Sequence, residues 1–201
     1  MFRRSLIALG IGIALVATAC SRDDTDGTAT PTATETATAA ATAAPTETAS
    51  ATAPAPASHL DTSYEIEGQV VTLVGGVAEV EAAPGSALKI TTRVFGNEAM
   101  GDLNGDGKED IAFLLTQDGG GSGTFFYAVV ALKTADGYTG TNAVLIGDRI
   151  APQTTEIHGT ELIVNYADRA PGEPMTTPPS IGVSKYLKVV DGKLVEAMPG
   201  A

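Results

Sequence analysis

One short segment combines oxygen-bearing side chains with a spacing that suits metal chemistry. It reads GDLNGDGKEDIAF, residues 101–113, and it has acidic or amide groups at alternate positions before it turns apolar. Counted from the first aspartate, positions one, three, five and nine carry side-chain oxygens, and position seven offers a backbone carbonyl. Calcium takes about six to eight oxygen ligands, and alternate residues of a tight loop can all point inward. The predicted calcium ligands are Asp102, Asn104, Asp106, the backbone carbonyl of Lys108, and Asp110.

Electrostatic repulsion is the physical reason to expect a cation in this loop. Aspartates at positions 102, 106 and 110 repel one another unless a positive charge lies between them. Gly105 and Gly107 permit the sharp turn, while Leu103 and Ile111 are expected to point away and anchor the loop to the core. The alternative is a solvated turn of Asp, Asn and Gly that binds no metal.

The loop departs from an EF-hand, which needs a bidentate Glu at position twelve and a helix on each side. Position twelve here is Phe113, and the flanking IAFLLTQ is typical of a strand. The segment instead resembles the loop of integrin-type FG-GAP repeats, and that resemblance implies a structural calcium that pins a hairpin between strands. One copy is present, which is too few for the propeller that such repeats build.

A wider resemblance extends from Gly101 to Glu196. The stretches GDLNGDGKEDIAFLLTQDGGGSGTFFYAVVAL, AVLIGDR, APGEPM and YLKVVDGKLVE are similar to a family of uncharacterised bacterial lipoprotein and periplasmic domains. In that family the segment matching APGEPM often leads into two cysteines, where this chain has Thr176 and Thr177. The resemblance therefore implies a fold and a location, with no disulfide at this point and no activity.

The start of the chain has the features of a lipoprotein signal. Two arginines precede an apolar run that is shorter than the ~20 residues of a membrane-spanning helix. Residues 17–20, Ala-Thr-Ala-Cys, resemble a bacterial lipobox, and Cys20 is the only cysteine. The prediction is lipid attachment at Cys20 to a bacterial membrane, with the protein exported and the folded domain outside the cytoplasm. The alternative is an ordinary signal peptide that contains a cysteine.

Composition divides the chain into three regions. Residues 1–19 are the predicted signal peptide, and residues 20–60 are a Thr/Ala/Pro-rich stretch that we predict to be a disordered tether. Residues 61–201 are long enough for one globular domain. The net charge of −12, without a basic cluster after Arg22, argues against a nucleic-acid partner. Expected partners are the membrane, through Cys20, and an envelope protein or glycan; the chain is expected to be a monomer.

Short β-branched runs separated by Gly, Asp-Gly and Pro predict a mostly β domain. The expectation is a single antiparallel domain, a meander or a sandwich, in which the calcium loop joins a hairpin. Asp191-Gly192 is the clearest hairpin turn. A short helix near residues 86–100 is the alternative, and it would make the fold α+β. The predicted strands span residues 65–73, 77–82, 88–95, 110–117, 124–133, 141–148, 154–160, 161–168, 184–190 and 193–197.

The other candidate groups favour contact over catalysis, and no catalytic residue is predicted. The glycine-rich segment 118–126 lacks the Lys-Ser/Thr ending of a phosphate loop, so we interpret it as a hairpin tip. His59 at the end of the tether and His158 in a turn are expected to be solvated. A long proline-rich loop is the predicted contact surface. Its candidate contact residues are Pro171, Gly172, Glu173, Pro174 and Met175.

These features favour a non-enzymatic lipoprotein that binds or scaffolds at the cell envelope and uses calcium as a structural ion. One alternative is a hydrolase of envelope polymers that uses carboxylates near the calcium loop. Another is an extracytoplasmic calcium sensor, in which the ion switches the loop between ordered and disordered forms.

Overall fold

A computed structural model describes residues 55–200 of the chain. It contains twelve strands and one turn of 3₁₀ helix, which confirms the predicted mostly β, antiparallel domain. Among these residues, no helix has the length and hydropathy that a membrane span requires. The predicted signal peptide, Cys20 and the tether up to residue 54 lie outside the described residues.

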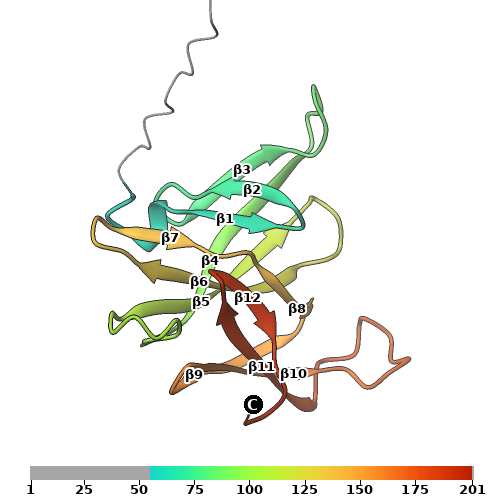
Figure 1. The fold of residues 1–201 in the computed structure, drawn as a ribbon. Helices are drawn as coiled ribbons and strands as arrows, with labels where there is room; N and C mark the ends of the chain where they lie inside the picture. Colours follow the sequence, from blue (N-terminus) through green and yellow to red (C-terminus); the bar gives the residue numbers. More distant parts are fainter. Residues whose placement is uncertain (1–54, 201) are drawn as a thin grey trace, which may run out of the picture. The chain divides into compact units, whose positions relative to one another are not determined.

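Three sheets make up the fold (Figure 1). A two-stranded hairpin pairs β1 (Ser63–Ile66) with β2 (Gln69–Thr72). The six-stranded sheet has the order β3-β4-β5-β6-β7, and β8 also pairs with β6. Its strands are β3 (Val77–Glu81), β4 (Lys89–Gly101), β5 (Asp110–Asp118), β6 (Phe125–Lys133), β7 (Tyr138–Gly140) and β8 (Val144–Asp148). The four-stranded sheet, ordered β12-β11-β10-β9, contains β9 (Ala151–His158), β10 (Glu161–Asp168), β11 (Ile181–Val190) and β12 (Lys193–Glu196).

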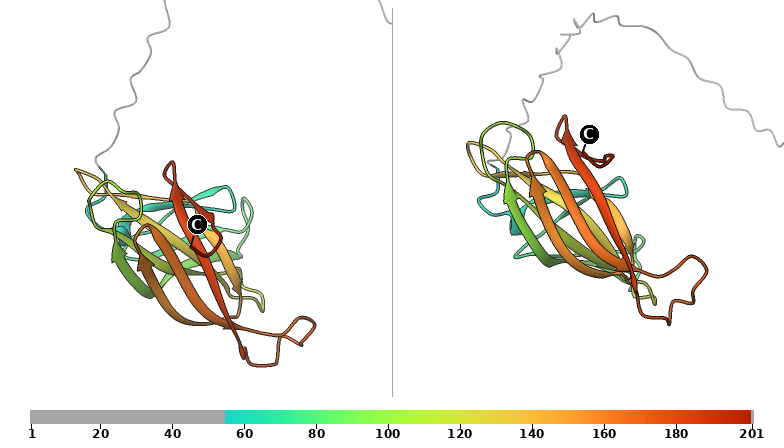
Figure 2. Two further views of the ribbon diagram at one scale, coloured as in Figure 1. Left: turned by 60° about the horizontal axis from the view of Figure 1, so that its bottom comes forward. Right: turned by 90° about the horizontal axis from the view of Figure 1, so that it is seen from below.

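Strands β5 and β6 are buried on both faces, and this organises the core. On β5, Ala112 and Leu114 belong to a cluster shared with the four-stranded sheet, which lies over the six-stranded sheet in Figure 2. The alternate residues, including Phe113 and Leu115, belong to a second cluster shared with the β1–β2 hairpin. A strand that is buried on both faces has apolar residues at consecutive positions. For this reason apolar and polar residues do not alternate in the segment IAFLL of β5.

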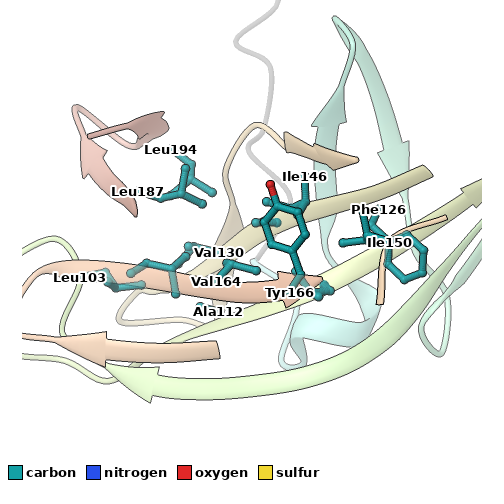
Figure 3. Packing of buried hydrophobic residues seen from close by; sticks show 13 residues of the cluster. Leu103, Ala112, Phe126, Val130, Ile146, Ile150, Val164, Tyr166, Leu187 and Leu194 are labelled. Carbon is teal, nitrogen blue, oxygen red and sulfur yellow. The ribbon is translucent and has the colours of Figure 1, made fainter. Parts of the chain in front are cut away.

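The first cluster has the form of a sandwich core. In Figure 3, Ala112 and Val130 of the six-stranded sheet face Val164 and Leu187 of the four-stranded sheet. Inward residues of β10 alternate with more exposed ones, as its sequence predicts. Of the two predicted architectures, the structure has the sandwich, with a hairpin covering the other face of its larger sheet.

The helix considered near residues 86–100 is absent, so the α+β alternative is wrong. From Lys89 onward these residues belong to the 13-residue strand β4, which pairs with β5 between Thr91 and Gly101. The register shifts at Gly96 and again before Ala99, and Asn97 has a left-handed backbone (φ 53°). Because a bulge inserts residues into one strand, it breaks the period-two pattern that would have identified the strand from sequence.

The single strand predicted over residues 65–73 is also wrong, because these residues contain a tight turn. Glu67 (φ 50°) and Gly68 (φ 80°) both adopt the left-handed conformation between β1 and β2, as a two-residue type I′ hairpin requires. Glutamate is an unusual first residue for such a turn, so the sequence signal was weak. The predicted Asp191-Gly192 turn is confirmed between β11 and β12.

Residues 55–61 pack against the sheets, although the sequence assigned most of them to the tether. The Tyr138 N–H donates to the Pro56 carbonyl (2.8 Å), and the Tyr64 hydroxyl donates to the His59 carbonyl (2.9 Å). The His59 ring lies edge-on to the buried Phe113, with centroids 5.2 Å apart, and only 15% of its side chain is exposed. The expectation that His59 is solvated is wrong, because the ring covers one end of the second cluster.

Candidate metal centre

The candidate calcium loop connects β4 to β5, as expected for a loop at the end of a hairpin. The two strands are antiparallel, and the pair next to the loop is Gly101 with Asp110. Leu103 is 1% exposed and belongs to the first cluster, whereas Ile111 belongs to the second. Both apolar residues therefore anchor the loop as the sequence predicts, and they do so on opposite faces of the central sheet.

Asp110 is buried, and backbone groups bind both of its carboxylate oxygens. Leu103 N–H donates to Oδ2 (3.0 Å), and Lys133 N–H at the end of β6 donates to Oδ1 (2.8 Å). Burial raises the pKa of Asp110 despite these two donors, and the charges of Asp106 and Asp102 raise it further. Asp110 thus joins the loop to β6, a link across 23 positions that no local sequence pattern reveals.

Asp102 organises the first half of the loop. Its Oδ1 accepts hydrogen bonds from the N–H groups of Gly105 (2.7 Å) and Asp106 (3.1 Å), and its Oδ2 accepts one from Gly107 (2.9 Å). Gly105 and Gly107 both have φ of 80°, the left-handed conformation that allows the chain to wrap round one carboxylate. The local sequence therefore determines the wrapping.

The second half of the loop carries the other candidate ligands. Asn104 Oδ1 accepts from the Asp106 N–H (2.9 Å), and Asp106 Oδ1 accepts from the Lys108 N–H (2.9 Å). The Lys108 ammonium also donates to Asp106 Oδ2 (2.9 Å), and this side-chain hydrogen bond lowers the pKa of Asp106. Lys108 supplies one positive charge beside three aspartates, so the loop keeps an excess of negative charge.

The donor set fits a hard cation such as calcium. Carboxylate and amide oxygens are the ligands that calcium prefers, and a carboxylate offers about four acceptor positions, so its bonds to N–H groups leave others open. Asn104 and Asp106 are exposed and Asp102 is half-buried, while the buried Asp110 also holds the loop in place. Within residues 55–200, no three His, Cys, Asp or Glu side chains lie in a ready-made metal cluster. Calcium binding stays a prediction.

The predicted contact loop lies between β10 and β11, and Figures 1 and 2 show it projecting at the opposite end of the domain from the β4–β5 loop. Pro171, Gly172, Glu173 and Pro174 are exposed, and Met175 is 41% exposed. The structure therefore does not bring the two predicted sites together.

Arg169 fixes the base of the contact loop. Its Nε donates to the Thr177 carbonyl (2.6 Å), and its Nη1 donates to the Arg149 carbonyl (2.9 Å). Arg149 itself has a left-handed backbone (φ 49°) and pairs with Asp148. The neighbouring Asp148–Arg149 and Asp168–Arg169 pairs are thus part of the turns that shape this end of the domain.

Comparison of the chain with protein-family models, with curated proteins and with solved structures finds no match. The resemblances to FG-GAP loops and to bacterial lipoprotein domains therefore stay predictions.

Proposed function

We propose that this chain is an exported lipoprotein, anchored to a bacterial membrane through Cys20, whose β domain is stabilised by calcium and binds or scaffolds at the cell envelope. The observation that carries the calcium part is the geometry of Asp102, whose carboxylate accepts three backbone N–H groups of its own loop. These bonds orient one carboxylate before any ion arrives, and such preorganisation favours binding.

A structural ion is favoured over a sensor by the way the loop is held. Leu103 and Asp110 fix its two ends in the core, so the loop has contacts that keep its shape without an ion. A sensor would need the loop to lose order when calcium leaves. Calcium bound to such a preformed loop would relieve the repulsion among Asp102, Asp106 and Asp110 and stabilise the β4–β5 hairpin.

A binding role is favoured over hydrolysis by where the described cavity lies. A glycosidase needs two carboxyl groups that flank a bound sugar. The described cavity has Glu65 as its one carboxylate and includes no residue of the calcium loop. The exposed contact loop around Met175 is the better candidate surface for an envelope partner.

Calcium titration of the full chain, purified in detergent, tests the calcium part. Thermal melts with chelator and with calcium at about 100 times its dissociation constant should differ by ~2.7 kcal/mol of unfolding free energy. Asp102→Asn should abolish the shift, whereas Asp136→Asn, at an exposed Asp-Gly turn between β6 and β7, should retain it. Absence of heat and of a shift in the wild type would refute calcium binding. Loss of structure in the chelated chain would favour the sensor.

Metabolic labelling with a palmitate analogue tests the anchor. In bacteria the wild-type chain should incorporate the label and sediment with membranes, and Cys20→Ala should do neither, because it removes the only thiol. Label on the Cys20→Ala variant, or no label on the wild type, would count against lipid attachment at this residue.

A further inference from the structure

A hollow of about 280 Å³ lies where the three sheets approach one another. Its walls come from the β1–β2 hairpin, from the connection between β7 and β8, and from the turn between β11 and β12. Glu65 and Val70 belong to the first wall, Asn142 to the second, and Lys193 to the third. These elements are distant in sequence, and none of them belongs to the calcium loop.

Hydrogen bonds across the hollow hold its walls in place. The Asn142 amide donates from Nδ2 to the Leu194 carbonyl (2.9 Å), and its Oδ1 accepts from the Leu194 N–H (2.9 Å). On the other side, the Ala143 N–H donates to the Glu65 carbonyl (2.7 Å). Because hydrogen bonds join the second wall to both of the others, the hollow is preformed, as small-molecule sites usually are.

Two glycines, Gly140 and Gly192, line the hollow. A Cβ on Gly140 would clash with the Ser63 carbonyl oxygen, so a side chain at this position would push β1 away. Gly192 is in the left-handed conformation (φ 73°), and its missing Cβ would point into open space. The close approach of β1 and β7 at this wall of the hollow therefore depends on glycine at position 140.

The hollow is lined by one negatively charged side chain, Glu65, and one positively charged side chain, Lys193. Glu65 Oε2 and Lys193 Nζ lie 2.7 Å apart, and their side chains are 42% and 58% exposed. An exposed pair of this kind contributes only ~0–1 kcal/mol, so a ligand that brings both charges can replace it at little cost. Val70, 72% exposed, adds an apolar surface beside the pair. A lining with equal and opposite charges disfavours ligands that carry charge of one sign only.

We propose that this hollow binds a small zwitterion, namely a free amino acid or a dipeptide, with the ligand ammonium at Glu65 and the ligand carboxylate at Lys193. The volume is just below the ~300–1,000 Å³ of drug-sized sites, which suits a ligand of one or two residues. Small apolar side chains on the ligand would lie against Val70. The site includes neither the calcium loop nor Cys20. A negative result for the dipeptide would therefore leave the proposed function untouched, and a negative result for calcium or the lipid would leave this proposal untouched.

Titration of the full ¹⁵N-labelled chain in detergent with L-alanyl-L-alanine tests the site. Saturable shifts are expected for the amides of Glu65, Val70, Asn142 and Lys193. Glu65→Gln and Lys193→Met should each weaken the dissociation constant about tenfold or more, since each removes a charge-assisted contact. N-acetyl-alanyl-alanine amide, which has neither charge, should give no saturable shift.

Lys89→Met is the matched control for Lys193→Met. Lys89 pairs with Glu79 at 3.2 Å on the β3–β4 hairpin, and its side chain is also 58% exposed. This variant should bind the dipeptide like the wild type, and the amide spectrum of every variant reports whether it is folded. Equal weakening by both lysine variants would overturn the proposal, as would binding of the uncharged analogue or the absence of shifts at millimolar dipeptide.

Discussion

At the scale of single residues, Asp110 shows how one side chain serves both loop and core. Its oxygens accept the N–H groups of Leu103 and Lys133, and the residue is fully buried. Asp110, which the sequence predicts to be a calcium ligand, is thus also the hydrogen-bond acceptor for two backbone N–H groups of the fold. This double role predicts two effects that do not require calcium.

Replacement of Asp110 by Ala should destabilise the calcium-free domain by about 2–5 kcal/mol, since the buried N–H of Leu103 and the partly buried N–H of Lys133 lose their acceptor. Urea unfolding in chelator measures the loss. Asp106→Ala is the control, because Asp106 lies in the exposed part of the loop, and it should change the unfolding free energy by less than ~1 kcal/mol. Equal losses in the two variants would show that Asp110 has no special structural role.

Asp110 also predicts a pH effect with a definite sign. Burial raises its pKa in the folded state, so between the ordinary and the raised value the folded domain holds more protons than the unfolded chain. The contribution of this residue to stability is therefore present below the ordinary pKa and is lost as pH rises through the raised one. In chelator, the unfolding free energy of the wild type should fall relative to that of Asp110→Asn as the pH rises above about 4. A pH-independent difference would contradict this assignment.

At the scale of elements, residues 55–61 behave as part of the domain. His59 contacts Phe113 and Tyr138 and pairs with Glu98 at 3.2 Å, while its backbone accepts from Tyr64. A fragment that begins at residue 61 would lose these contacts. The predicted tether would therefore join the domain next to β7, where the Pro56 carbonyl accepts the N–H of Tyr138.

The two histidines allow a paired test of this element. His59→Ala should lower the unfolding free energy by about 1–3 kcal/mol, because it removes an aromatic contact with the core. His158→Ala should change it by less than ~0.5 kcal/mol, since that side chain is 65% exposed although it also pairs with a glutamate. Denaturant melts of both variants measure the difference. Similar small effects would mean that residues 55–61 add nothing to stability.

At the scale of the whole domain, β5 and β6 join two cores into one cooperative unit. Each strand contributes one face to the sandwich core and the other to the core beneath the β1–β2 hairpin. Damage to one core is therefore transmitted to the other through the shared backbone. Such sharing predicts a single unfolding transition for the described domain.

Leu114→Ala tests this coupling from the sandwich side. The substitution creates a cavity in the first cluster and should cost about 2–5 kcal/mol. Amide hydrogen exchange should accelerate by similar factors in β10, which shares that cluster, and in β1, which does not. Wild-type protection that persisted in β1 would show that the hairpin unfolds separately.

Much of the local structure follows from sequence alone. The Asp191-Gly192 turn, the alternation in β10 and the wrapping of residues 102–107 round Asp102 depend on neighbours within a few positions. The backbone preferences of single residues and the alternation of buried and exposed positions are sufficient to predict these three features. The bulge in β4 and the turn at Glu67 were missed because both depart from those local rules.

Only the tertiary structure decided which distant groups meet. The pairing of Asp110 with Lys133, the burial of His59 and the approach of Glu65 to Lys193 across 128 positions depend on how the sheets stack. Such contacts are chosen by the burial of apolar area over the whole domain, a sum that no short window of sequence contains. The sequence determined a mostly β domain and the donors of a candidate calcium loop, and the packing of three sheets determined which of its other polar groups share a site.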